Sequence, residues 1–403
     1  MAGLFALACV SGAQAQTVVR LTGSTAFRLN TLNAITHIYD PGFTYGYTGT
    51  SFGGSTQAIF FGTIGGQSTT IKTTWSGSEG GMQTVAGSVA IAFLPNTTPV
   101  STGGTNNAPP CTGGGSCDNS IPDVEMADSF QSASAFFGLY RGVTYATLTE
   151  SPNSPVGVVP FKYAVSKNAP AALTNITNKQ ARALFGAGAL PLAFFTGNPA
   201  DETTTVVASG RDPDSGTRLS VSAETGQGPQ ASVKHWQPLD GAGNVVKTVN
   251  GAIARFAPWP ASTINGIPIA VFNGGYNSGG DLSKMLANTT PANTCVVSYA
   301  SVNDMDANAL PNGARELAFN GVLLGNTGGN YNTVGLLTGG EYTLWCYEHV
   351  YYRAGSPAAS VADTLANQLK TADAPILLTN MRVERLSDGG VVFPSYTTVP
   401  PPQ

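Results

Sequence analysis

Three segments of the chain place Gly, Ser and Thr where an apolar run gives way to a helical pattern. They are Gly23-Ser24-Thr25, Gly77-Ser78-Glu79-Gly80-Gly81 and Asp214-Ser215-Gly216-Thr217. The first turn of a helix has free N–H groups and the positive end of the helix dipole, which together bind anions. A Ser or Thr before a helix usually serves only as a cap. Three such segments, with Arg211 four residues before Ser215, nevertheless predict an oxyanion site.

Composition excludes several other kinds of function. The chain has 19 Lys and Arg against 23 Asp and Glu, a net charge of −4, and only 10% charged residues. No basic stripe could neutralise a nucleic-acid backbone, so we expect no nucleic-acid partner. An anion must then be held by local dipoles and hydrogen bonds, because the overall field would not attract it.

Enzyme and metal chemistry are also disfavoured. Ser78 lies in Ser76-Gly77-Ser78-Glu79-Gly80, which lacks the first Gly of a G-x-S-x-G nucleophile turn. The sequence contains no P-loop, no H-E-x-x-H and no G-x-G-x-x-G after a strand. Three histidines without ligand spacing (His37, His235 and His349) give no metal site. We therefore expect no enzyme, no cofactor and no bound metal.

The N-terminal region indicates export. An apolar stretch from Leu4 to Val10 ends in Ala13-Gln14-Ala15, which predicts a signal peptide over residues 1–15, cut before Gln16. The basic region that normally precedes such a stretch is missing, so we expect the natural start to lie upstream of Met1. After residue 16 no run of 18 apolar residues would span a membrane. The expected location is the periplasm or the exterior.

Four cysteines remain after that cleavage site, an even number that favours two disulfides in an exported protein. Cys111 and Cys117 enclose a short Gly-rich loop that closes easily, which leaves Cys295 to pair with Cys346. The surrounding residues 96–121, rich in Pro, Gly, Thr and Asn, predict a surface insertion.

Strand and helix patterns alternate along the chain, which indicates an α/β architecture with open sheets. The expected strands are 18–21, 71–75, 156–165 and 204–208, and the expected helices are 26–35, 82–85, 178–185, 215–224, 279–288 and 360–371. Each oxyanion-type turn therefore stands between a strand and the helix that follows it.

The segment 206–218 resembles the signature loop of the periplasmic phosphate-binding proteins of ABC transporters. It contains an R-x-x-x-S-G-T pattern as Arg211, Ser215, Gly216 and Thr217. The resemblance spans most of residues 17–350. The other segments that are similar to landmarks of this family are 22–27, 77–81, 123–129, 158–165, 173–185, 297–299, 317–322 and 341–344.

The resemblance implies a fold and its division. It implies a two-lobed periplasmic-binding-protein fold of type II, with two open sheets flanked by helices and a hinge of two crossing strands. Lobe one would take residues 16–155 and 343–403, and lobe two would take residues 156–342. A hinge closure would bury the ligand between them.

The same resemblance implies the ligand contacts. Phosphate would be bound by ten residues: Ser24, Thr25, Ala26, Phe27, Ser78, Asp128, Arg211, Ser215, Gly216 and Thr217. Arg211 would offer a planar fork to two oxygens. Asp128 would accept the proton that phosphate carries near neutral pH and would repel sulfate, which carries none.

Three positions depart from the family pattern. Pro213 stands where an acidic partner of the arginine is usual, so Asp212 or Asp214 would have to hold Arg211. Glu79 must point away from the ligand, and Ala26 replaces a common Thr.

The sequence thus predicts an exported, monomeric solute-binding protein that captures inorganic phosphate, or a similar tetrahedral oxyanion, for uptake through an ABC permease. The alternative is a binding-fold protein that serves as a secreted surface or matrix component with a relaxed or absent anion site. Low charge and Gly-, Asn- and Thr-rich loops suit that alternative.

Overall fold

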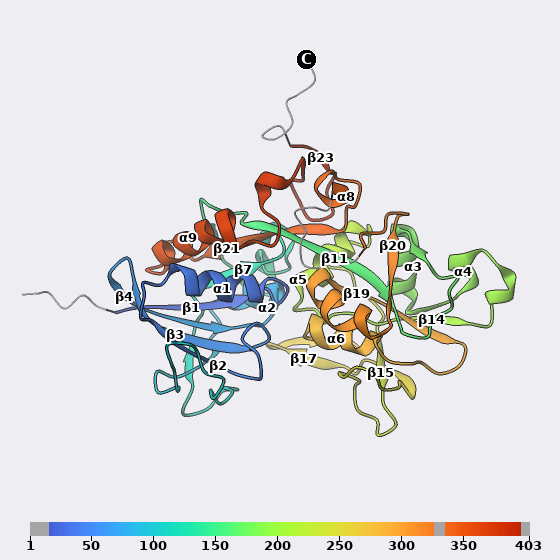
Figure 1. Ribbon diagram of the computed structural model, residues 1–403, viewed down its shortest axis with the longest axis horizontal. Coiled ribbons are helices and arrows are strands. Elements are labelled where there is room, and N and C mark those ends of the chain that lie inside the picture. Colours follow the sequence, from blue (N-terminus) through green and yellow to red (C-terminus); the bar gives the residue numbers. More distant parts are fainter. Residues whose placement is uncertain (1–15, 326–334, 396–403) are drawn as a thin grey trace, which may run out of the picture.

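The computed structural model describes residues 16–325 and 335–395, so the predicted signal peptide over residues 1–15 lies outside the described residues. Within them, a 13-stranded mixed sheet forms the centre of the molecule. Ten of its strands lie in the order β13-β14-β19-β11-β21-β7-β1-β4-β3-β2, and three more pair beside this row: β10 (Thr149–Glu150), β12 (Asn175–Ile176) and β20. Helices pack along it, which confirms the predicted α/β class. Figure 1 shows the two ends of the sheet on opposite sides of the molecule, joined through its middle by β11 and β21.

The first half of the sheet is built around parallel strands. In it β1 (Thr17–Gly23) pairs in parallel with β4 (Gln67–Thr74) and β7 (Val124–Ala127). Two antiparallel strands complete its edge: β3 (Gln57–Ile64) and β2 (Thr44–Tyr47). The helices of this half are α1 (Arg28–Ile38), α2 (Ser78–Ala86) and α9 (Ala359–Gln368).

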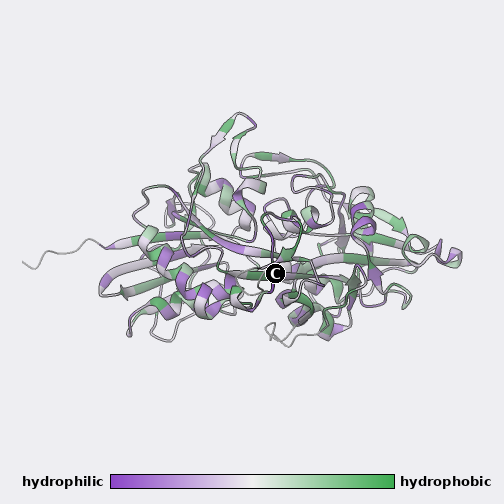
Figure 2. Cartoon of the chain, turned by 90° about the horizontal axis from the view of Figure 1, so that it is seen from above, coloured by the Kyte–Doolittle hydropathy of each residue, from purple (hydrophilic) through white to green (hydrophobic). Residues whose placement is uncertain are grey.

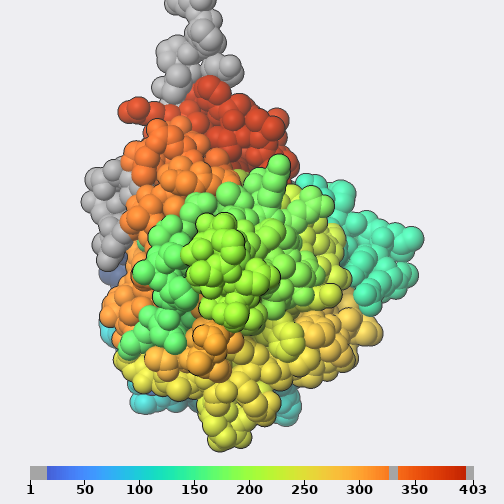
Figure 3. Space-filling model, turned by 90° about the vertical axis from the view of Figure 1, so that its right-hand side faces the viewer, coloured from blue at the N-terminus to red at the C-terminus, as the bar shows by residue number. Residues whose placement is uncertain are grey.

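The second half repeats that plan with other strands. In it β14 (Thr205–Ala208) lies parallel to β19 (Thr294–Ser301), with β13 (Ala189–Pro191) antiparallel at the edge. A further strand, β20 (Arg315–Phe319), pairs with β11. The helices of this half include α3 (Asn178–Ala187), α5 (Gly216–Glu224) and α6 (Gly279–Leu286). In Figure 3, α3 and the short α4 (Ala193–Thr196) lie toward the viewer at this end, in green.

Two long strands connect the halves. The first residues of β11 (Gly157–Val165) pair with β21 (Trp345–Tyr352), and its last five pair with β19. The last residues of β21 pair in turn with β7 of the first half. All residues of both strands are buried. These are the predicted crossing strands, whereas the lobe boundaries at residues 155 and 343 stay a prediction.

Local sequence signals explain where the helices begin. Thr177 and Gln180 form a reciprocal capping box at the start of α3, and the Ser278 hydroxyl caps α6. Hydrophobic and hydrophilic residues are intermixed along the elements of both halves (Figure 2). Among the described residues no helix has the length and apolar character needed to cross a bilayer.

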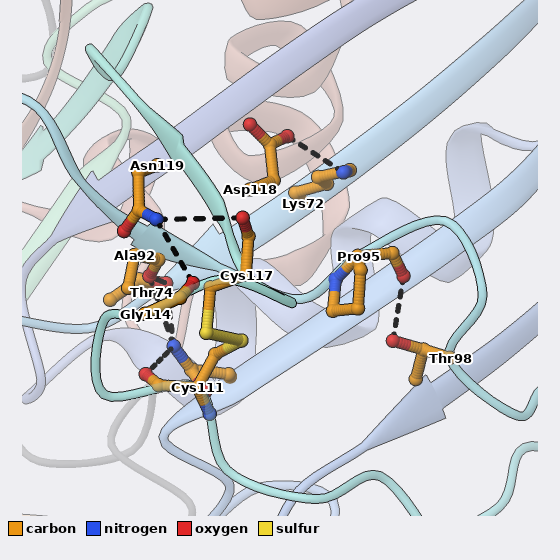
Figure 4. The surroundings of a disulfide bond; sticks show 11 residues. Lys72, Thr74, Ala92, Pro95, Thr98, Cys111, Gly114, Cys117, Asp118 and Asn119 are labelled. Atoms are coloured by element: carbon orange, nitrogen blue, oxygen red, sulfur yellow. Dashed lines mark hydrogen bonds and ion pairs between the residues drawn. A yellow bond between two sulfur atoms is a disulfide. The ribbon is translucent and has the colours of Figure 1, made fainter.

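The predicted surface insertion carries the predicted disulfide. Cys111 and Cys117 are bonded to each other, and β6 (Asp118–Ser120) follows directly and pairs with β5 (Ile91–Phe93) (Figure 4). The Gln57 side chain accepts from the Cys111 N–H at 2.8 Å and donates to its carbonyl at 2.9 Å. The insertion is thereby tied to the edge of the first half.

The predicted pairing of Cys295 with Cys346 is wrong, because the structure leaves both as separate buried thiols. Cys346 lies opposite Val159 in β11, whereas Cys295 lies beyond the point where β19 pairs with Val165. The six residue-to-residue steps from Val159 to Val165 span about 20 Å of strand. A disulfide needs Cα atoms within about 7 Å, so the two sulfurs cannot meet.

Thiol chemistry should distinguish the two kinds of cysteine. We expect Cys295 and Cys346 to react with a maleimide only after unfolding, because they are buried. Cys111 and Cys117 should react only after their disulfide is reduced, and peptide mass mapping distinguishes the two pairs. Replacing Cys111 and Cys117 together by Ser should lower the free energy of unfolding by about 2 kcal/mol, since the closed loop is short. Urea unfolding measures this change. Labelling of Cys295 in the native protein would contradict its burial.

Candidate functional site

The N-termini of α2 and α5 meet where the two halves of the sheet touch. The N–H groups of Glu79 and Gly80 in α2 donate to the Asp214 carbonyl of the second half, at 2.9 and 3.3 Å. The carbonyl therefore takes the place at this helix N-terminus where an anion oxygen could sit. Because the donors lie in one half and the acceptor in the other, the contact holds the halves together.

Asp128 lies between these two helix N-termini. It follows β7 directly and its side chain is only 1% exposed. The Ser78 hydroxyl donates to its Oδ1, and the Thr217 hydroxyl donates to its Oδ2 at 2.9 Å. Its own N–H donates to the Ser78 hydroxyl oxygen at 3.1 Å. Two hydroxyls predicted as anion donors, one from each half, thus bind the Asp128 carboxyl.

Gly216 makes this approach possible. A Cβ at position 216 would overlap Oδ1 of Asp128 and would lie 2.7 Å from Cβ of Ser78. Only a residue without a side chain lets α5 approach so closely. The Ser220 hydroxyl, one turn further along α5, donates to the Asp128 carbonyl at 2.8 Å. The resemblance-based residues Ser78, Asp128, Gly216 and Thr217 therefore lie in one cluster.

Opposing effects act on the Asp128 carboxyl. Burial raises its pKa, while the hydrogen bonds from Ser78 and Thr217 and the nearby charge of Arg211 lower it, and the net direction is upward. Each of its two oxygens accepts one hydroxyl hydrogen bond inside the protein.

Arg211 lies beside this cluster and is 2% exposed. Its Nε donates to the Tyr276 carbonyl at 3.1 Å, and its Nη2 donates to the Asn277 carbonyl at 3.2 Å and to the Thr25 hydroxyl at 3.1 Å. The contact with Thr25 crosses between the halves. Sequence patterns could not reveal the two carbonyls, because backbone groups leave no residue-type signal.

The expectation that Asp212 or Asp214 holds Arg211 is wrong. Within the described part of the chain neither Asp212 nor Asp214 forms an ion pair with Arg211 within 4.0 Å, because the guanidinium is turned toward the carbonyls ahead of α6. Burial raises the pKa of Asp212 to about 6, although the charges of Arg211 and Arg218 oppose this. The Arg28 guanidinium and the Asp304 carboxyl also interact electrostatically with Arg211.

The remaining predicted contacts have local partners. The Phe27 N–H donates to the Ser24 hydroxyl at 3.3 Å, and the Phe27 ring is fully buried in the core. Ala26 is partly buried against the same core. Ser215 accepts from the Arg218 N–H at 3.2 Å and is the N-cap of α5. Of the first loop, Thr25 alone reaches Arg211 in the described structure.

Several carboxyls are buried around the cluster. Glu79 accepts from the Ser134 hydroxyl at 2.8 Å. Glu125 and Glu348 are fully buried; the Glu125 oxygens have no hydrogen-bond partner within residues 16–325 and 335–395, and the Ser24 hydroxyl interacts with the Glu348 carboxyl. Burial raises the pKa of Glu79 to about 8 and raises those of Glu125 and Glu348 well above the ordinary value. Sequence reasoning missed Glu125 and Glu348, although a Glu inside an apolar strand was a visible signal.

Comparisons with known proteins give remote likenesses only. No family model matches the chain, and no curated protein matches it. A putative phosphate ABC transporter substrate-binding protein from Clostridium perfringens shares 10% identity, with a TM-score of 0.46 over 90% of this chain and 100% of that one. An ABC-type phosphate transport receptor from Vibrio cholerae shares 12% identity, with a TM-score of 0.41 over 89% and 95%. The chain is similar to these proteins in overall structure alone, and we base no residue role or ligand on them.

The close approach at Gly216 can be tested by substitution. Gly216→Ala should lower the free energy of unfolding by about 2–4 kcal/mol, because its methyl group overlaps Asp128 and Ser78 in a buried contact. Gly186→Ala is the matched control: it lies in α3, and a Cβ there meets nothing within 4 Å. The control should be neutral or stabilising by about 0.5–1 kcal/mol. Equal effects of the two variants in urea unfolding would contradict the packing described.

The buried carboxyls predict how stability varies with pH. Glu79 has an ordinary pKa of 4.5 and a folded pKa of about 8, so the folded protein binds its proton more tightly than the unfolded chain does. Its contribution to stability is complete below pH 4.5 and is lost as pH rises toward 8; Glu125 and Glu348 act in the same direction. Urea unfolding should show lower stability at pH 8 than at pH 5. In Glu79→Gln the decline should be shallower, and a rise in stability over this range would refute the assignment.

Proposed function

We propose that this chain is an exported solute-binding protein that holds a tetrahedral oxyanion, inorganic phosphate, between two lobes for ABC-type uptake. The observation that carries the proposal is the meeting of Ser78 and Asp128 from the first half with Thr217 and Gly216 from the second. These are hydroxyl, carboxyl and backbone groups at two helix N-termini, with Arg211 beside them. Such groups bind an oxyanion without a large net positive charge.

The carboxyl of Asp128 marks where the anion would bind. A carboxyl is itself an oxygen acceptor, and the hydroxyls of Ser78 and Thr217 each donate to one of its oxygens. For phosphate to enter, the two halves must separate slightly and these hydroxyls must turn from Asp128 to phosphate oxygens. Asp128 then accepts the phosphate proton, which sulfate does not offer.

The opening would take place at the crossing strands. The contacts that must part include those from Glu79 and Gly80 to Asp214, from Thr217 and Ser220 to Asp128, from Arg211 to Thr25 and from Gln83 to Asn265. All are hydrogen bonds between residues 16–155 and 156–342, the segments proposed as the two lobes. β11 and β21 would flex as the hinge.

Location and partners complete the proposal. The apolar stretch before Gln16 and the disulfide in the insertion fit an oxidising compartment outside the cytoplasm. The protein would act as a monomer and deliver its ligand to a membrane permease with its own ATPase.

One observation favours the alternative of a surface or matrix component. The Glu79 and Gly80 N–H groups and the Ser78 and Thr217 hydroxyls already have partners inside the protein. A chain that needs no anion to join its two halves could keep this arrangement permanently.

Calorimetry distinguishes the two functions. We expect the protein to bind phosphate and not sulfate at neutral pH. Thr217→Val should weaken phosphate binding by about tenfold, because it removes one hydroxyl donor. The matched control is Thr364→Val, whose exposed hydroxyl only donates to the Ser360 carbonyl; it should bind phosphate as the unmodified protein does.

Asp128→Asn tests the choice of anion. It removes the carboxylate that repels sulfate and should allow sulfate to bind, while phosphate binding weakens. If the unmodified protein gives neither heat nor a change in unfolding temperature with phosphate, capture for uptake is excluded and the structural alternative stands.

A further inference from the structure

A second polar site lies between the two halves, beside the contact of α2 with Asp214. It is a cavity of about 200 Å³ lined from the first half by Glu79, Phe136 and Tyr140. The second half lines it with Asp214 and with Ile267 and its neighbours on β17 (Ser262–Ile264) and β18 (Ile267–Ile269). We call it the Glu79–Asp214 cavity. Its volume suits a small organic molecule.

The β17–β18 hairpin reaches from the second half to α2 and forms one wall of this cavity. The Gln83 side chain of α2 donates to the Asn265 carbonyl at the tip of the hairpin, at 3.0 Å. Ile267 packs against the hydrophobic cluster of the first half that contains Met82 and Val85. A molecule in the cavity therefore contacts both halves at once.

Two carboxyls in the wall have no cationic partner. Glu79 is 4% exposed; its Oε2 accepts from the Ser134 hydroxyl at 2.8 Å, and the Ala135 N–H also interacts with its carboxyl. The Asp214 Oδ2 has only a long contact of 3.5 Å with the Asn265 amide. Neither carboxyl forms an ion pair within 4.0 Å across residues 16–325 and 335–395.

The two arginines of the wall are engaged elsewhere. The Arg218 guanidinium donates to the Arg211 carbonyl at 3.3 Å and to the carbonyl and side-chain oxygen of Asn273, at 2.8 and 2.5 Å. Arg141 is exposed and lies over the Tyr140 ring, 5.5 Å from its centroid. Neither arginine therefore forms an ion pair with Glu79 or Asp214 in the described residues.

The apolar part of the wall contains aromatic faces. Phe136 and Tyr140 meet edge to face with centroids 5.9 Å apart, and three isoleucines (Ile264, Ile267 and Ile269) stand in the hairpin wall. Aromatic rings attract organic cations, and apolar side chains bind the hydrocarbon part of such a molecule.

We propose that the Glu79–Asp214 cavity binds a small organic ammonium compound, with the ammonium group at the two carboxyls and the apolar substituent against Phe136, Tyr140 and the isoleucines. Burial raises the pKa of Glu79 to about 8 and raises that of Asp214, with Asp212 and Glu79 adding to the effect. Without the ligand the Glu79 carboxyl holds a proton near neutral pH, so ammonium binding releases that proton to the buffer. Because the cavity lies between the halves, their separation for phosphate entry would open it, so amine binding is measured without phosphate.

Three probes with one ring and different head groups test the charge requirement: 2-phenylethylamine, 2-phenylethanol and phenylacetate. Calorimetry on the full chain at pH 7 should show that the amine binds at least about tenfold more tightly than the alcohol, with no binding of the acid. Repeating the titration in buffers of different ionisation enthalpy should reveal proton release. Equal binding of the amine and the alcohol, or no binding of the amine at millimolar concentration, would overturn the proposal.

Variants then locate the site. Glu79→Gln keeps the shape and the hydrogen bond from Ser134 but removes the charge, and should weaken amine binding by about tenfold or more. Asp214→Asn should act likewise. Glu202→Gln, a matched change at an exposed carboxyl, should have no effect. If Glu79→Gln and Asp214→Asn fold and bind the amine unchanged, the site is elsewhere and the proposal fails. Phosphate titrations of the same variants keep this result separate from the proposed function.

Discussion

The structure depends most on how the Asp128 carboxyl is buried between two halves of one sheet. A buried carboxyl is costly unless hydrogen bonds or a proton compensate it, and here hydroxyls from both halves do so. The same hydrogen bonds require that α2 and α5 point their N-termini toward each other and that position 216 carry no side chain. Removing either hydroxyl would leave a buried carboxyl oxygen unpaired. The hydrogen bonds that compensate the buried carboxyl are therefore the same ones that hold the two halves together.

That constraint extends to the surrounding charges. Glu79, Glu125 and Glu348 are buried near Asp128 and lack cationic partners in the described structure, so burial raises the pKa of each. Arg211 is the guanidinium that reaches the cluster, and its donors are divided between backbone carbonyls and Thr25. Any anion that enters would favour protonation further, since negative charge nearby raises a carboxyl pKa. Under the proposed function, ligand capture and proton uptake would therefore be linked at this site.

Much of this could be predicted from the sequence, and the failures have physical reasons. The helices predicted over 178–185 and 215–224 are found in the structure, where Thr177 and Ser215 cap them, because a cap is a local interaction. The strand predicted over 156–165 is also found, because its apolar run is local too. The meeting of Ser78, Asp128 and Thr217 was reached through family resemblance, since no local pattern brings them together. Cys295 was wrongly paired with Cys346 because an even number of cysteines does not show where two strands place their sulfur atoms. The backbone carbonyls that accept from Arg211 could not be predicted, because every residue has a carbonyl and the sequence does not mark which one is used.

The two crossing strands also have a consequence for how the chain is made. The second half of the sheet is contiguous in sequence, from the last residues of β11 to β20, so it can pair its strands as soon as they leave the ribosome. The first half can pair β1, β2, β3, β4 and β7 early, but β21, which lies between β7 and β11, is synthesised about two hundred residues after β7. Helix α9, which packs on α1, arrives later still. The first half must wait as an incomplete sheet, with an open edge at β7, until the second half is finished.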